Sequence, residues 1–207
     1  MTSKINEFLD PYFDEYQKLA FSKDLYESLN AFQEIALKVK SQNAKLIFAG
    51  NGASAAISAH GAVDFTKQAK VRGITFNEAD LITCYANDFG YENWVAEAIK
   101  SYADNNDAVV LTSVSGESMN AVNAAKVAKG MGLKVITFTG REESNSLKLL
   151  GDLNFWVDSH AYNIVECIHM IWITTVIDVI VGKAVYEVSW SLNKHPINYL
   201  ITLWKKF

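Results

Sequence analysis

The sequence has little of what marks secreted, disulfide-linked or multi-domain proteins. It contains only two prolines and two cysteines in 207 residues, and Cys84 and Cys167 form no spaced pair. Such cysteine usage is typical of reduced thiols in a cytoplasmic protein. Scarce proline leaves few linkers, and no internal repeat or low-complexity segment is visible. The chain is long enough for one α/β domain with a substantial core.

The sequence also lacks an excess of positive charge: the net charge is −4, and no basic tract occurs. Nucleic acid is therefore not expected as a partner. The N-terminal stretch MTSKINEFLDPYFDEY places acids and aromatics where a signal peptide needs an uninterrupted apolar run. Half of the residues are apolar and a fifth are charged, as in ordinary soluble globular proteins. We expect a cytoplasmic protein.

Hydrophobic spacing predicts an α/β fold. Apolar residues recur at helical spacing over residues 3–42, which predicts two helices, with a break or second start at Pro11. Beyond them, short apolar strands alternate with helices. We expect strands at 46–49, 73–77, 108–112, 135–139 and 154–157, and helices at 54–67, 91–102, 118–131, 146–150 and 162–183. This alternation favours a parallel sheet covered on both faces, with ligands at the carboxyl ends of its strands.

Two of the predicted strands lead into turns that suit an anion. The first continues through Gly50, Asn51 and Gly52 into a small-residue helix from Ser54. Free N–H groups at the start of such a helix suit phosphate. The strand at 108–112 leads into the serine-rich stretch TSVSGES. A single serine there would be a helix cap, whereas the cluster favours phosphate binding. Neither turn has a nucleotide-binding pattern, so no nucleotide cofactor is expected.

Two predicted helices carry pairs of titratable side chains. His60 and Asp64 stand four apart, and Glu166 and His169 stand three apart in the apolar helix at 162–183. A membrane span would bury Glu166, His169 and Asp178 in hydrocarbon, so a core or subunit-interface helix is favoured and no membrane partner is expected. A lone Glu-x-x-His pair is most often structural. Two converging helices could nevertheless bring two imidazoles and two carboxylates together, which suits acid–base chemistry or Zn²⁺.

The stretches GNGASA, ISAHGAVDFT, YANDFGY, TSVSGES and VECIH, in this order, resemble the SIS (sugar isomerase) domain family, most closely its phosphoheptose isomerase type. The resemblance covers the chain to about residue 183. It implies a flavodoxin-like three-layer α/β/α sandwich with a five-stranded parallel sheet and N-terminal helices. It also implies a homotetramer with active sites at subunit interfaces. We thus expect one SIS domain over residues 1–183 and a C-terminal extension over 184–207, which has no counterpart in the family.

The resemblance assigns roles to individual residues. The catalytic pair falls on Asp64, where the family has glutamate, and on His169. A zinc-binding set found in some members falls on His60, Asp64, Glu166 and His169. At the position of Glu166 the family usually has glutamine. The residues implied to bind the substrate are Asn51, Gly52, Ser54, Asn87, Asp88, Ser113, Ser115, Ser118 and Glu166; Asn87 and Asp88 match a loop that faces the sugar.

The implied activity is aldose–ketose isomerisation of a phosphosugar through an enediol. The expected substrate is sedoheptulose 7-phosphate, converted to D-glycero-D-manno-heptose 7-phosphate for lipopolysaccharide or capsule. Val114, Glu117 and Gln68 replace residues common in the family, so an isomerase for another phosphosugar is an alternative. A non-catalytic SIS protein of the replication-initiator-associating type is a second alternative. The acid retained at Asp64 and the histidine at position 169 favour the enzyme.

Overall fold

The computed structural model describes residues 2–185. Its centre is a five-stranded, all-parallel sheet in the order β2-β1-β3-β4-β5. This is the strand order of flavodoxin-like folds, whose topological switch point lies between β1 and β3. Residues 186–207, nearly all of the predicted C-terminal extension, lie outside the described residues. The strands are β1 (Leu46–Gly50), β2 (Gly73–Thr75), β3 (Ala108–Ser113), β4 (Lys134–Thr139) and β5 (Leu153–Trp156).

The central strands are buried on both faces, which explains their continuous apolar runs. Successive side chains of β1 point to opposite sides, so Leu46 and Phe48 join one core while Ile47 and Ala49 join the other. All five residues of β1 and all six of β3 are buried. The predicted sheet is thus confirmed, with strand ends shifted by one or two residues.

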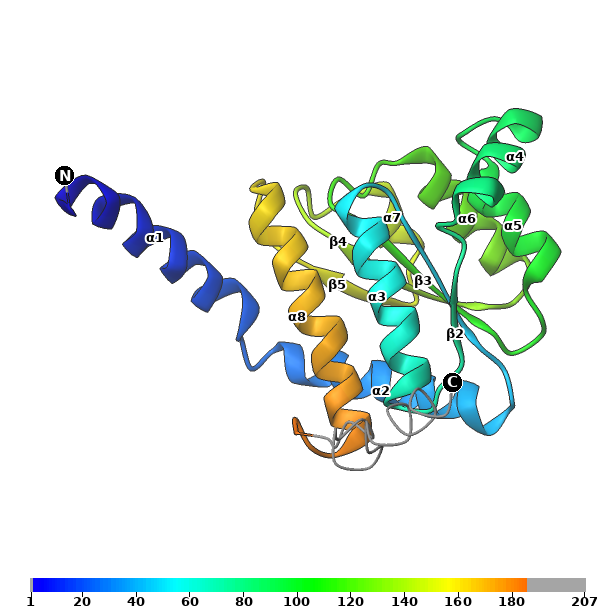
Figure 1. The fold of residues 1–207 in the computed structure, drawn as a ribbon, viewed down its shortest axis with the longest axis horizontal. Helices are drawn as coiled ribbons and strands as arrows, with labels where there is room; N and C mark the ends of the chain where they lie inside the picture. Colours follow the sequence, from blue (N-terminus) through cyan, green and yellow to red (C-terminus); the bar gives the residue numbers. More distant parts are fainter. Residues whose placement is uncertain (1, 186–207) are drawn as a thin grey trace, which may run out of the picture.

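Helices cover each face of the sheet and complete the three layers (Figure 1). One core lies between the sheet and α2 (Leu25–Ser41), α3 (Ala53–Lys67) and α8 (Tyr162–Val181). The second core lies under α5 (Trp94–Tyr102), α6 (Met119–Gly130) and α7 (Ser146–Leu150). Because α3 and α8 contact each other side by side, the residues on their adjoining faces share one surface (Figure 1).

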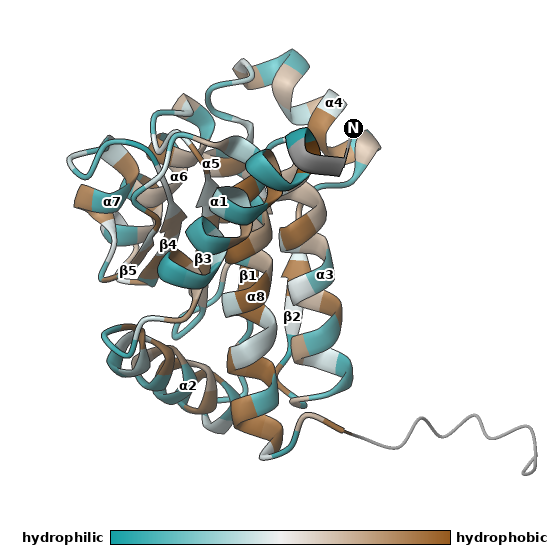
Figure 2. Ribbon diagram, turned by 90° about the vertical axis from the view of Figure 1, so that its left-hand side faces the viewer, coloured by the Kyte–Doolittle hydropathy of each residue, from teal (hydrophilic) through white to brown (hydrophobic). Residues whose placement is uncertain are grey.

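Helix α8 is long and apolar enough to cross a membrane by length and composition alone, with a mean hydropathy of 2.0. Figure 2 shows apolar residues along most of its length. In the structure it packs against α1, α2 and α3 and buries Ile168, Trp172 and Val176 in the first core. It is a core helix of a soluble-type α/β fold, as its charged residues indicated.

Helix α1 (Thr2–Ala20) extends away from the body of the molecule (Figure 1). It continues through Pro11, so the break expected there is wrong. Proline removes one backbone hydrogen bond and disfavours a helix interior by about 3 kcal/mol. Here the turns on both sides of it remain helical. Ile5, Phe8 and Phe13 on this arm are 58%, 63% and 59% exposed.

One helix was missing from the sequence prediction. Helix α4 (Ala79–Phe89) covers most of the stretch that was expected to be a loop. It has no fully buried residue, and Leu81, Ile82 and Tyr85 pack only partly against the second core. The apolar residues of this stretch do recur at helical spacing, so the error came from the family resemblance, which assigned a loop to Asn87 and Asp88.

Candidate active site

A small cavity opens where β1 and β3 end, at the switch point of the sheet. Its volume is about 100 Å³. In flavodoxin-like sheets, ligands bind at this place. The cavity is lined by Asn51, Ser54, Ser113, Val114, Ser115, Ser118, Tyr162 and Glu166. The structure therefore brings together six of the nine residues predicted to bind the substrate.

The turn after β1 brings backbone close to the cavity. A Cβ at Gly50 would lie 2.6 Å from the carbonyl oxygen of Ser54, so only glycine lets the chain pass this closely. Gly52 has a φ of +56° and precedes α3 as its N-cap residue. Glycine adopts this conformation without steric cost. The two glycines thus place Asn51 and Ser54 at the cavity, although Gly52 itself does not line it.

The loop after β3 presents the other hydroxyl groups. The buried Ser113 donates a hydrogen bond to Oγ of Ser118 over 3.3 Å and accepts one from the amide of Gly116 over 3.2 Å. Ser115 accepts a hydrogen bond from the amide of Glu117 over 3.2 Å. These bonds fold the loop back so that the side chains of Ser113, Ser115 and Ser118 all line the cavity.

The starts of three helices reach this cavity. Gly52, Ser118 and Ala161 are the N-cap residues of α3, α6 and α8, and no N-cap side chain makes a capping hydrogen bond. Free N–H groups and the positive ends of helix dipoles favour an anion. No lysine or arginine is among the lining residues. The cavity is therefore suited to phosphate through backbone amides and serine hydroxyls.

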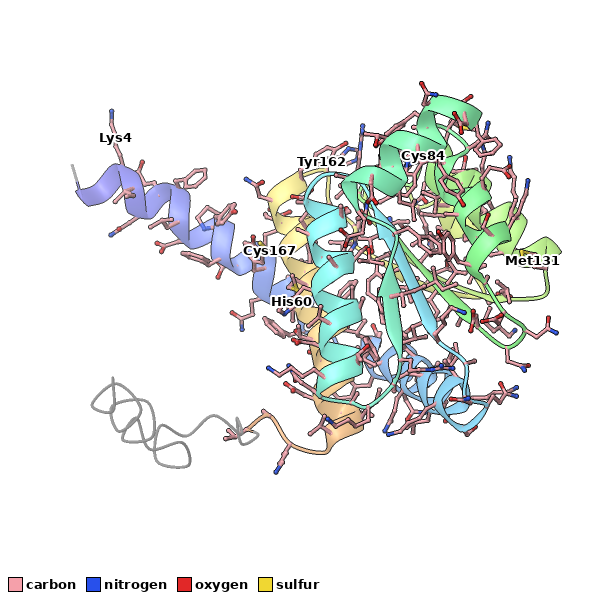
Figure 3. All side chains as sticks on the ribbon, turned by 45° about the vertical axis from the view of Figure 1, so that its right-hand side comes forward. Lys4, His60, Cys84, Met131, Tyr162 and Cys167 are labelled. Carbon is pink, nitrogen blue, oxygen red and sulfur yellow. The ribbon has the colours of Figure 1, made fainter. Side chains whose placement is uncertain are left out.

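Glu166 gives the cavity one carboxyl group. Burial raises the pKa of this carboxyl above its usual value. Burial thus disfavours the charged carboxylate, the form that would repel an anion. Tyr162, one turn earlier on α8, lines the same wall and lies at the start of that helix (Figure 3).

Asn51 is held by two side chains that the sequence analysis did not single out. Its amide exchanges two hydrogen bonds with the amide of Asn120, over 2.9 and 2.8 Å. The Tyr91 hydroxyl donates a third to Oδ1 of Asn51 over 3.0 Å. Asn120 is buried at the start of α6, so this network connects the turn after β1 with the turn after β3. Tyr91 is the last residue of YANDFGY, one of the stretches that resemble the family, so the sequence did contain a signal for Tyr91.

The four predicted acid–base and metal-binding residues do not converge. Nε2 of His60 lies 3.1 Å from Oδ2 of Asp64, and their side chains are 52% and 16% exposed. Figure 3 shows His60 on α3. His169, in contrast, is fully buried beside Phe138 and Trp172 and does not line the cavity.

The predicted zinc set does not fit the described chain. Residues 2–185 contain no group of three or more histidine, cysteine, aspartate or glutamate side chains that could hold a metal ion. A zinc site needs such a group of ligands at about 2 Å from the ion. Nε2 of His169 is already engaged by the carbonyl oxygen of Thr139 at 3.0 Å. The donor types suit zinc, but their placement does not.

Asn87 and Asp88 lie in the last turn of α4 and not in a loop, which corrects the sequence prediction. The side-chain amide of Asn87 donates a hydrogen bond to Oδ1 of Asp88 over 2.9 Å. Both side chains are exposed, and neither lines the cavity. Their predicted contact with the sugar stays a prediction.

Comparison with known proteins identifies the family. The family model described as SIS domain matches residues 12–140. The chain belongs to the SIS domain family. This SIS protein is 30% identical to the phosphoheptose isomerase of Aliarcobacter butzleri over 162 residues, covering 75% of the chain and 85% of that relative. It is 31% identical to the probable phosphoheptose isomerase of Thermoplasma acidophilum over 166 residues, covering 77% and 90%.

A solved structure shares the fold of this SIS protein. The phosphoheptose isomerase of Neisseria gonorrhoeae superimposes with a TM-score of 0.79 at 23% sequence identity, covering 87% of this chain and 98% of that one. The predicted SIS fold is thus confirmed, and with it the resemblance to the phosphoheptose isomerase type. The match includes both glycine and serine turns of the cavity, since residues 12–140 contain them.

Proposed function

We propose that this chain is a phosphosugar aldose–ketose isomerase that converts sedoheptulose 7-phosphate to D-glycero-D-manno-heptose 7-phosphate. The observation that carries this proposal is the serine-lined cavity at the switch point, in a chain whose curated relatives are named phosphoheptose isomerase. The cavity would take the phosphate group. The product would serve heptose synthesis for lipopolysaccharide or capsule, in the cytoplasm.

The sugar would extend from the phosphate along α3. A helix rises about 1.5 Å per residue, so His60 lies about 9 Å further along the axis than Ser54. This distance is comparable to the length of an extended sugar phosphate. His60 also lies about 120° around α3 from Ser54. A long sugar that curves around the helix would bring its reacting carbons to the His60–Asp64 pair, whose atoms are 3.1 Å apart.

Isomerisation moves one proton between neighbouring carbons. A base removes a proton from C1 of the ketose to give an enediol and returns it to C2, while an acid transfers a proton from the oxygen on C1 to the oxygen on C2. Such positioned groups contribute about 10²–10⁴-fold each. We assign the carbon-bound proton to Asp64 and the transfer between oxygens to His60, because each contacts the other and both reach solvent.

His169 was the predicted partner of Asp64, and its surroundings support a different role. Its ring is fully buried, and burial lowers its pKa to about 4. Its Nε2 donates to Thr139, and its Nδ1 has no partner among residues 2–185. A catalytic role would need the ring to leave the core. We therefore infer that His169 anchors α8, and a kinetic comparison of His60 and His169 variants tests both assignments.

We also propose a homotetramer, as the resemblance implies. Support comes from the exposed apolar side chains of Ile5, Phe8 and Phe13 on the projecting helix α1. An apolar helix face of this kind is typical of an oligomer interface. Sedimentation equilibrium of the wild-type protein and of a Phe8→Asp, Phe13→Asp double variant tests this. We expect a tetramer for the first and smaller species for the second.

The activity is tested with purified protein on sedoheptulose 7-phosphate and a panel of other phosphosugars, each with and without a chelator. We expect turnover of sedoheptulose 7-phosphate that a chelator leaves unchanged. Loss with chelator and recovery with zinc would support the zinc prediction instead. Turnover of another phosphosugar alone would change the substrate assignment. Binding without turnover across the panel would support a non-catalytic SIS protein, which the named relatives do not favour.

A further inference from the structure

We infer that Glu117 is a positioning residue for phosphate binding, and that its carboxylate latches the serine loop of the cavity to the start of α7. This inference rests on the proposed function, because it concerns the same phosphate cavity. Glu117 stands between Gly116 and Ser118, inside the loop, yet it does not line the cavity. Its exposed side chain turns to the neighbouring helix.

Both carboxylate oxygens of Glu117 bind Ser146. Oε1 accepts a hydrogen bond from the Ser146 amide over 2.8 Å, and Oε2 accepts one from its hydroxyl over 2.7 Å. Hydrogen bonds to a charged group are stronger than neutral ones. These bonds hold the pKa of Glu117 below its usual value, so the group is ionised at neutral pH. At neutral pH the carboxylate therefore carries the charge that strengthens both hydrogen bonds.

A second tie joins the same two segments beneath the latch. The amide of Leu147 donates a hydrogen bond to the carbonyl oxygen of Gly116 over 2.9 Å. A Cβ at Gly116 would lie 1.9 Å from Oδ1 of Asn145, so the loop rests directly on that side chain. Asn145 is 1% exposed, and its amide donates to the carbonyl oxygen of Glu142 over 2.8 Å. The start of α7 is therefore a fixed platform for the loop.

The latch controls the two hydroxyl groups next to it in the chain. Ser115 and Ser118 flank the Gly116–Glu117 pair, and both line the cavity. The carbonyl oxygen of Gly116 is bound by the Leu147 amide, whereas the exposed end of the loop is held by the bonds between Glu117 and Ser146. Release of the carboxylate would let Ser118 and the first amides of α6 move relative to Ser113. This movement would weaken phosphate binding without altering the reacting carbons.

The test compares four proteins by calorimetric titration with inorganic phosphate: the wild type, Glu117→Ala, Glu117→Gln and Glu143→Ala. Glu143 is the matched control, because it is also an exposed glutamate near α7, bound to Lys148 over 3.1 Å. We expect Glu117→Ala to weaken phosphate binding roughly three- to tenfold. Glutamine keeps one acceptor oxygen and should recover part of the loss. Glu143→Ala should match the wild type.

Steady-state kinetics separate positioning from general destabilisation. In Glu117→Ala the KM for the sugar phosphate should rise by the same factor as the phosphate dissociation constant, with kcat within twofold of the wild type. Wild-type affinity in Glu117→Ala would overturn the inference. Ser146→Ala, which removes one of the two bonds, provides the measurement if Glu117→Ala does not fold, and unchanged affinity there would also overturn it. Failure of the wild type itself to bind phosphate would overturn the proposed cavity as well.

Discussion

Nε2 of His169 lies 3.0 Å from the carbonyl oxygen of Thr139, the last residue of β4. Because a carbonyl oxygen can only accept, we assign the ring proton to Nε2. The next amide, that of Gly140, donates to the carbonyl oxygen of Val114 in the serine loop over 2.9 Å. The contact thus ties the middle of α8 to the strand end beside the serine-lined cavity. We infer that His169 supports this cavity from within the core.

The buried ring predicts a pH-dependent stability. Burial lowers the pKa of His169 from 6.5 to about 4 in the folded state, so the unfolded chain binds a proton first as pH falls. Above pH 6.5 the titration of His169 has no effect on stability. As pH falls from 6.5 to about 4, this titration lowers the free energy of unfolding by roughly 1.4 kcal/mol per pH unit.

Urea unfolding at several pH values checks this contribution. His169→Gln cannot titrate, so its stability should fall less steeply between pH 6.5 and 4, while other groups titrate equally in both proteins. Parallel pH profiles for the variant and the wild type would show that His169 is not a buried neutral ring.

A second prediction separates the two candidate imidazoles. Asp64→Asn and His60→Gln should each lower kcat by about 10²-fold or more, since each removes a positioned acid–base group. His169→Gln should lower stability but keep kcat within tenfold. Initial-rate kinetics on sedoheptulose 7-phosphate measure this, with Asp158→Asn, on an exposed residue outside the cavity, as the control. A kcat lost in His169→Gln and retained in His60→Gln would restore the assignment from the family resemblance.

A third prediction concerns the glycine of the serine loop. Gly116 has a φ of +66°, and an added Cβ would collide with Asn145. Gly132 has a φ of +75°, but its Cβ would meet nothing within 4 Å. The left-handed conformation alone costs alanine about 1–2 kcal/mol. Gly132→Ala should lose about this much by thermal unfolding. Gly116→Ala should lose more and should also bind phosphate more weakly; equal losses would exclude the close contact.

A fourth prediction concerns Tyr91, which holds Asn51 through its hydroxyl group. Tyr91→Phe removes one hydrogen bond worth about 0.5–1.5 kcal/mol, so the KM should rise roughly two- to tenfold. Tyr102→Phe is the matched control, because Tyr102 packs on Phe76 and does not line the cavity. An unchanged KM in Tyr91→Phe would mean that Asn51 needs no support from this side.

Most of the fold and part of the candidate site could be predicted from the sequence. Continuous apolar runs such as 108–111 mark buried parallel strands, and the glycines and serines that follow them mark the cavity. Helix α4 was missed because the family resemblance assigned a loop to Asn87 and Asp88, although the apolar residues of this stretch recur at helical spacing. The burial of His169 could not be predicted for another reason. Helix α8 is apolar on nearly all sides, so spacing alone could not show that Glu166 faces the cavity while His169 faces β4.

The latch between Glu117 and Ser146 could not be predicted from the sequence either, because the two partners lie 29 residues apart. Contacts of this range depend on how the strand ends are placed, and only the folded sheet sets that placement. The same holds for the pair of Asn51 and Asn120, which lie 69 residues apart.

Nuclear magnetic resonance of sedoheptulose 7-phosphate in deuterium oxide tests the central claim most directly. An enediol route predicts conversion to the aldose phosphate, with deuterium from solvent incorporated at C2, in the presence of the wild-type protein and not of Asp64→Asn. If the wild-type protein binds inorganic phosphate yet leaves the sugar unconverted and unlabelled, the cavity binds phosphate without isomerase chemistry, and the account is contradicted.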